Sequence, residues 1–141
     1  MKKYYLQLML IILALVFGGC STKTPTSIAG KISLPVTFKS VWYRPTLDKS
    51  GYFVMTDTGT LSVEDNFIKF EGEKEVIIIP FSEIISVSFK KLGSDFINKW
   101  VVIKYGKQTP PKYAVMSDGR YMGWAGGSSK IFSTIKYATK K

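Results

Sequence analysis

The sequence predicts a mainly β domain of about seven short antiparallel strands, closed by one amphipathic helix at its C-terminal end. Segments rich in β-branched and aromatic residues recur between residues 36 and 116, separated by turn-forming residues. After residue 127 the apolar residues instead follow a helical spacing. With 141 residues, 45% of them hydrophobic, the chain has the length of one domain and enough apolar side chains to fill a core.

The first candidate strand, residues 36–44 (VTFKSVWYR), changes the parity of its apolar positions near Ser40. This change predicts a bulge or bend at that point. Four shorter candidate strands follow, at residues 52–56, 60–63, 67–70 and 76–79. Residues 57–59 and 64–66 have the composition of turns. The last segment, VIII at 76–79, is continuously apolar and ends at a proline, which predicts a strand buried on both faces.

The second half of the domain contains three further candidate strands, at residues 83–92, 98–105 and 112–116. Within the first of them, alternation predicts that Ile85, Val87 and Phe89 share one face. The closing helix is expected to begin at Ser128 and Ser129, because a serine hydroxyl can accept a hydrogen bond from a free amide of the first turn. One face of this helix carries Ile131, Phe132, Ile135 and Ala138.

The N-terminus has the pattern of a secretory signal: Lys2 and Lys3, an apolar run over residues 6–17, then small residues. The run is shorter than the about 20 apolar residues that a membrane-spanning helix needs. Residues 17–20 (FGGC) resemble the lipobox of bacterial lipoproteins, with phenylalanine in place of the usual leucine. Two alternatives stay open: an ordinary cleaved signal with a chance cysteine, and an uncleaved N-terminal anchor.

The lipobox resemblance implies that Cys20 carries a thioether-linked diacylglycerol with palmitate-like chains and becomes the mature N-terminus. Several acyl chains on one residue give stable membrane anchoring. Cleavage would remove 19 residues, two of them lysines, and leave 122 residues with a formal charge of +8 in place of +10. The expected organisation is a signal peptide at 1–19, a lipidated tether at 20–35 and a β domain at 36–141. The expected location is the bacterial cell envelope, facing the periplasm or the exterior.

Residues 59–63 (GTLSV), 67–70 (FIKF) and 79–87 (IPFSEIISV) follow one another with a characteristic hydrophobic rhythm. With WVVI at 100–103 and the final helix, this rhythm resembles the pleckstrin-homology-like superfold, including its GRAM-like branch. The resemblance implies a bent antiparallel barrel or sandwich with the helix closing one open end. It implies no activity, because one such fold hosts many functions. Residues 44–49 lack the basic Lys-x-Arg pattern of lipid-binding members, so phosphoinositide binding is not supported.

The composition excludes several kinds of chemistry. The chain has no histidine, which removes Ser-His-Asp and Cys-His nucleophile pairs and histidine-based metal sites. Its one cysteine cannot form an intrachain disulfide. The acidic residues are scattered, and the tightest group, Glu71, Glu73 and Glu75, fits a solvated turn. We therefore predict no enzyme activity, no metal and no cofactor.

Two sets of residues are candidates for binding. Lysines could form a surface for an anionic membrane or envelope polymer, although charge for solubility explains them equally: Lys90, Lys91, Lys104, Lys107, Lys130 and Lys136. An exported protein is not expected to meet nucleic acid. Tyr121, Met122 and Trp124 could line a groove for an envelope protein, or could simply pack over the barrel mouth. The glycine-rich stretch 123–127 could bind an anion at the start of the helix, but a flexible crossover fits it better.

The leading hypothesis is a non-catalytic lipoprotein that binds or scaffolds a protein partner or the anionic membrane surface. The alternative from another class is a small carboxylate-based envelope hydrolase or transferase. Aspartates and glutamates converging in a pocket would favour the enzyme. Carboxylates dispersed in turns would favour the binding module. The sequence leaves the oligomeric state open.

Overall fold

The computed structural model describes residues 32–47, 55–92, 99–120 and 126–140, all within the unit Ile32–Lys141. The strands in these ranges are β1 (Val36–Arg44), β2 (Asp57–Val63), β3 (Phe67–Gly72), β4 (Val76–Pro80), β5 (Ile84–Lys91), β6 (Lys99–Tyr105) and β7 (Lys112–Asp118). A short 3-10 turn, η1 (Phe81–Glu83), precedes β5, and helix α2 (Gly127–Ala138) follows β7. Within these ranges, no helix is long and apolar enough to span a membrane.

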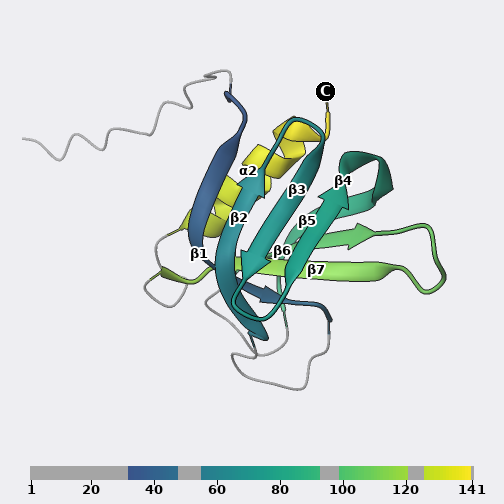
Figure 1. The fold of residues 1–141 in the computed structure, drawn as a ribbon, viewed down its shortest axis with the longest axis horizontal. Helices are drawn as coiled ribbons and strands as arrows, with labels where there is room; N and C mark the ends of the chain where they lie inside the picture. Colours follow the sequence, from purple (N-terminus) through teal and green to yellow (C-terminus); the bar gives the residue numbers. More distant parts are fainter. Residues whose placement is uncertain (1–31, 48–54, 93–98, 121–125, 141) are drawn as a thin grey trace, which may run out of the picture. The chain divides into compact units, whose positions relative to one another are not determined.

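The seven strands of the described ranges form one sheet in the order β4-β3-β2-β1-β7-β6-β5, with antiparallel pairing throughout (Figure 1). Strands β4 and β5 are the two edges of this sheet. Helix α2 packs against β5, β6 and β7. The predicted fold class, a mainly β domain of seven antiparallel strands closed by a C-terminal helix, is confirmed. It is the arrangement that the pleckstrin-homology-like resemblance implied.

The main core lies between the inner face of the sheet and α2. Ile131, Ile135 and Ala138 of the helix are buried in it, which confirms the predicted helical face. Phe132 stacks on Phe89 of β5 with ring centroids 5.3 Å apart. Full burial of a side chain such as Ile131 or Ile135 contributes about 1.5–3 kcal/mol. The apolar face of α2 therefore fixes the helix against the second half of the sheet.

Strand β1 contains the bulge predicted at Ser40. The pairing register with β2 shifts between Phe38 and Val41, and Ser40 has a positive φ of 56°. Beyond the bulge, β1 pairs with β2 on one side and with β7 on the other. Before the bulge it pairs with β2 alone among the described strands. The two halves of β1 thus have different surroundings.

The prediction of a turn at residues 57–59 is wrong, because β2 begins at Asp57. The Asp57 carboxylate accepts backbone hydrogen bonds from the turn between β3 and β4, so its partners lie far away in sequence. Gly59 pairs with Gly72, and a Cβ at Gly59 would collide with the backbone of the neighbouring strand. Of the strand predicted at 52–56, residues 55 and 56 are not in a strand, and residues 52–54 lie outside the described ranges.

The prediction of a doubly buried strand at 76–79 is also wrong. Strand β4 is an edge strand, and its side chains at Val76 and Ile78 are 60% and 56% exposed. The alternation predicted for β5 fails at Ile85, which is 56% exposed, because the register with β6 shifts between Ile84 and Ser86. A run of apolar residues reports β propensity, but it does not reveal which strand lies at an edge.

The expected serine cap of the helix is not formed. The residue before the helix is Gly126, in the left-handed conformation with φ 69°, and no side chain of its own caps the first turn. Ser128 lies inside the helix and is buried. Its hydroxyl oxygen accepts a hydrogen bond from the Asp118 N–H at 2.9 Å and lies 3.1 Å from the Ser117 hydroxyl oxygen. This serine therefore joins α2 to β7.

Candidate binding groove

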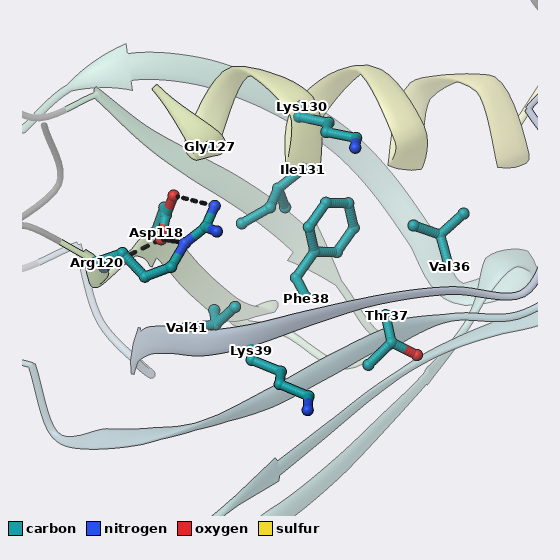
Figure 2. Close-up of a pocket in the computed structure, with 10 residues that line it drawn as sticks. All are labelled: Val36, Thr37, Phe38, Lys39, Val41, Asp118, Arg120, Gly127, Lys130 and Ile131. Atoms are coloured by element: carbon teal, nitrogen blue, oxygen red, sulfur yellow. Dashed lines mark hydrogen bonds and ion pairs between the residues drawn. The ribbon is translucent and has the colours of Figure 1, made fainter. Parts of the chain in front are cut away.

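A cavity of about 310 Å³ lies between the first half of β1 and the N-terminal part of α2 (Figure 2). Phe38 of β1 and Ile131 of α2 point toward each other across it, and Val41 lies beside them. Ile131 and Val41 belong to the buried core, and Phe38 packs against that core. The floor of the cavity is therefore apolar. We call this cavity, with its walls on β1 and α2, the β1–α2 groove.

The wall on β1 is the edge of the strand itself. Residues 36–39 all line the groove. Figure 2 shows that Val36 and Phe38 point toward α2, whereas the side chains of Thr37 and Lys39 point away from it. Thr37 and Lys39 therefore line the groove through their backbone.

This edge lies where β7 stops pairing with β1. The pairing of β1 with β7 covers Val41 to Arg44, and the Gly119 N–H donates the last described backbone bond, to the Ser40 oxygen at 2.8 Å. Before Ser40, no strand of the described ranges pairs with this side of β1. The groove thus exposes backbone hydrogen-bonding groups that a further strand could use.

Asp118 lies at the end of the groove, where β7 meets the start of α2. Its side chain is buried, and its two carboxylate oxygens accept hydrogen bonds from Arg120: Nε at 3.0 Å, Nη2 at 2.9 Å and the backbone N–H at 3.0 Å. The Gly127 N–H also donates to this carboxylate. Asp118 therefore takes the place of the missing serine cap, and it satisfies an amide at the N-terminus of α2.

Burial alone would raise the pKa of Asp118, but the hydrogen bonds and charge of Arg120 and the bond from Gly127 outweigh burial and lower the pKa. The carboxylate is therefore ionised at neutral pH. Because it already occupies an amide of the first turn of α2, it competes with any external anion there. The possible anion site at 123–127 is not supported at Gly127, and residues 123–125 lie outside the described ranges.

The rim of the groove is positively charged. The side chains of Arg120 and Lys130 line it, and the Lys39 side chain lies on the face of β1 that points away from α2. Asp118, which is paired with Arg120, is the one acidic residue among the lining residues of the described ranges. Lys130 is exposed on the first turns of α2. The surroundings of the groove thus carry a net positive charge, which favours anionic groups.

The six lysines predicted to bind an anionic surface lie on β5, on β6 and the loop after it, and on α2. Lys130 alone among them lines the groove. Lys90 and Lys91 lie at the end of β5, Lys104 lies in β6, and Lys107 lies in the loop after β6. Lys130 and Lys136 lie on α2. Lys91 pairs with Lys99 across β5 and β6, where two like charges face each other. The role of these lysines in surface binding stays a prediction.

The remaining predicted site residues, Cys20, Tyr121, Met122 and Trp124, lie outside the described ranges, and their roles stay predictions. Lys39, Arg120 and Asp118 are not predicted as a group by any pattern in the sequence. Residues 37–39 and 118–120 are about 80 positions apart, so no local pattern joins them. The one available signal was the alternation of Val36 and Phe38 before the bulge.

A second buried carboxylate, Asp57, lies at the start of β2. It accepts backbone N–H bonds from Thr58 at 2.8 Å, Glu73 at 3.1 Å, Lys74 at 3.0 Å and Glu75 at 3.2 Å. Burial alone would raise its pKa, but these four donors lower the pKa below its ordinary value. In the part of the chain that the structure describes, no three His, Cys, Asp or Glu side chains come together as a metal site would require.

No protein-family model and no curated protein matches the chain. Among solved structures, the chain is similar to the Vps36 N-terminal PH domain, with 7% sequence identity and a TM-score of 0.49. That similarity covers 77% of this chain and 83% of the other. What the groove binds is therefore argued from its own residues.

Proposed function

We propose that the protein is a lipid-anchored, non-catalytic binding module of the bacterial envelope that docks a protein partner in the β1–α2 groove. The observation that carries this proposal is the combination of an open strand edge, an apolar floor and a positive rim in one cavity. An exposed strand edge offers main-chain hydrogen bonds to a partner, and neighbouring apolar pockets give the contact specificity. A cavity of this size falls within the range of ligand sites, about 300–1,000 Å³.

The distribution of carboxylates favours binding over hydrolysis. The enzyme alternative required aspartates and glutamates that converge in a pocket. In the described ranges, Asp118 is the acidic residue of the groove, and it is held by Arg120 and Gly127. Asp57 is occupied by four backbone amides. Neither carboxylate is placed to act as half of a general acid–base pair.

The anchoring part of the proposal rests on Cys20 and its lipobox-like surroundings. Replacing Cys20 with alanine should abolish labelling of the protein by a radioactive or clickable lipid precursor and leave the signal peptide uncleaved. Labelling and electrophoretic mobility of the precursor measure both effects. Undiminished labelling of Cys20→Ala would show that the anchor is not at this cysteine.

The docking part can be tested in living cells with a photo-crosslinking amino acid placed at single positions. At position 130, on the groove rim, illumination should join the chain to one discrete protein partner. Position 107, exposed in the loop after β6, is the matched control and should give no such product. The same product from both positions, or none from position 130, would contradict docking at the groove.

A further inference from the structure

We propose that the β1–α2 groove takes an extended acidic segment of the partner, which adds as a strand beside residues 36–39 of β1. This inference rests on the proposed function, because it specifies the partner segment that the groove receives. Among the described strands, β2 pairs with one side of residues 36–38, and the other side of residues 36–39 faces the groove. A strand that pairs there continues the sheet at the place where β7 leaves β1.

The length of the added strand follows from the length of the edge. Residues 36–39 span about 13 Å at the usual rise of about 3.3 Å per residue. Beyond them, the Ser40 oxygen already accepts the Gly119 N–H. A segment of about four to six residues therefore uses this edge fully.

The two faces of β1 differ in chemistry, and this difference sets the pattern of the incoming strand. Side chains that point toward α2 would meet Phe38, Val41 and Ile131, all apolar. Side chains that point the other way would lie beside Thr37 and Lys39. Because successive side chains of a strand alternate between faces, the segment that fits best alternates apolar and acidic residues.

Charge separates this edge from the outer edge of β4. Arg120 is paired with Asp118, which leaves Lys130 on the α2 wall of the β1–α2 groove and Lys39 on the other face of β1, so an acidic segment gains attraction there. By contrast, Glu71 lies in β3 and Glu73 and Glu75 lie in the β3–β4 turn, together with Lys74 and with Lys69, which is paired with Glu71. The surplus of one negative charge there disfavours an acidic segment. The β5 edge carries Lys90 and Lys91 but is interrupted by the irregular register at Ile85, a feature that hinders strand addition.

The test uses the full chain in uncharged detergent micelles and a synthetic acetylated peptide of alternating valine and glutamate, six residues long. Binding is followed by fluorescence anisotropy, and amide hydrogen exchange locates the bound peptide. We expect slower exchange of the amides at residues 36–39, by tenfold or more at saturating peptide. A peptide of the same sequence that is N-methylated at every residue, and so cannot donate the strand bonds in either register, should not bind.

Charge is tested with a protein variant, a matched control variant and one altered peptide. Lys39→Glu should weaken binding of the valine–glutamate peptide by about threefold to tenfold, because Lys39 lies on the face that the glutamates share, whereas Lys107→Glu, a control outside the groove, should change it less than about twofold. The corresponding valine–lysine peptide should bind more weakly to the unmodified chain and more tightly to Lys39→Glu. Exchange rates away from the groove show whether each variant remains folded.

Several results would overturn strand addition at β1. These are equal binding of the N-methylated peptide, no binding of the valine–glutamate peptide at millimolar concentration, or protection that falls on β4 or β5. Alternate amides of this segment bond to β2, so the amides that point toward the groove are the informative ones. Slow exchange of those amides without peptide would mean that the edge is already occupied. Sedimentation then distinguishes a second copy of the chain from a segment of the same chain.

Failure of the peptide test and failure of the proposed function are distinguishable. If position 130 crosslinks one partner in cells but the peptides do not bind, a protein docks at the groove by other means than an acidic strand. If neither experiment succeeds, the groove is not a docking site and both proposals fall.

Discussion

Two buried aspartates lie on the two strands that pair with β1, Asp57 on β2 and Asp118 on β7, and their carboxylates have different partners. Asp57 begins β2 and is 4% exposed, and Asp118 ends β7 and is 2% exposed. The Asp57 carboxylate accepts only backbone N–H donors, three of them in the turn that leads to β4. The Asp118 carboxylate accepts a backbone donor of α2 and also binds the Arg120 guanidinium.

The difference separates a structural role from a role in binding. Asp57 shapes the turn between β3 and β4. None of the four residues that donate hydrogen bonds to its carboxylate lines the β1–α2 groove. Asp118 fixes the start of α2 and orients a cation on the groove rim. Substitutions at the two positions should therefore have different consequences for stability and for binding.

The largest effect is expected for Asp118→Ala. The change removes the acceptor of the Gly127 N–H and of Arg120, and it should lower the free energy of unfolding by about 2–3 kcal/mol. It should also weaken binding of the valine–glutamate peptide, because Arg120 loses the partner that orients it. Urea unfolding followed by tryptophan fluorescence measures the first effect. A loss under about 0.5 kcal/mol would mean that Asp118 does not hold the helix start.

Asp57→Ala should have a smaller effect, because the amides of residues 73–75 lie in an exposed turn where water can replace the carboxylate. We expect a lower urea midpoint than that of the unmodified chain but a higher one than that of Asp118→Ala. Exchange of the amides at 73–75 should accelerate, and peptide binding should stay unchanged. Weakened peptide binding by a folded Asp57→Ala variant would break the contrast between the two aspartates.

Both aspartates should make the domain less stable in acid. Each has a pKa below its ordinary value of 3.8 in the folded chain. The folded state therefore binds these protons more weakly than the unfolded state, so stability is full above the ordinary pKa and falls as pH drops through the lowered values.

The measurement is the urea midpoint between about pH 7 and about pH 2, for the unmodified chain and for the Asp57→Ala, Asp118→Ala double variant. The midpoint of the unmodified chain should fall toward acid more steeply. The two curves should approach each other at the lowest pH. Parallel curves over the whole range would show that the two carboxylates are not the groups that lose stability.

Local patterns predicted the parts of the fold that depend on neighbours in sequence. The parity change at Ser40 located the bulge, and the spacing of Ile131 and Ile135 located the buried face of α2. The turn predicted at Asp57 was wrong because three of its hydrogen-bond partners lie 16 to 18 residues away. A three-residue polar stretch ending in glycine carries no sign of such partners.

Local sequence patterns could not predict the exposure of Ile78 or the set of residues that lines the groove, and the reason is related. Burial of a strand depends on whether another strand pairs beyond it, and that is decided by the order of strands in the sheet. Lys130 was predicted as a binding residue from its charge alone. Lys39 and Arg120 join it only because β1 bulges away from β7 and α2 folds back across the opening.

The smallest effect is expected for the attraction of the domain to a membrane surface, in which neither aspartate takes part. A chain that begins at Ser21 keeps the whole unit Ile32–Lys141 and should bind vesicles containing anionic lipid weakly, with binding lost between about 0.05 M and about 0.5 M salt. Lys107→Gln should reduce partitioning by less than about fivefold, because one cation near such a surface contributes about 1 kcal/mol. Vesicles of zwitterionic lipid are the control.

Vesicle binding also sharpens the contrast between the aspartates. The lysines outside the groove take no part in the hydrogen bonds of Asp118, so a folded Asp118→Asn variant should retain vesicle binding while it loses affinity for the acidic peptide. If the Asp118→Asn variant lost both vesicle binding and peptide binding, one surface would serve both the membrane and the peptide. Vesicle binding that ignores salt would instead point to apolar insertion. The exposed large apolar side chains of the described ranges are Met55, Val76, Ile78 and Ile85.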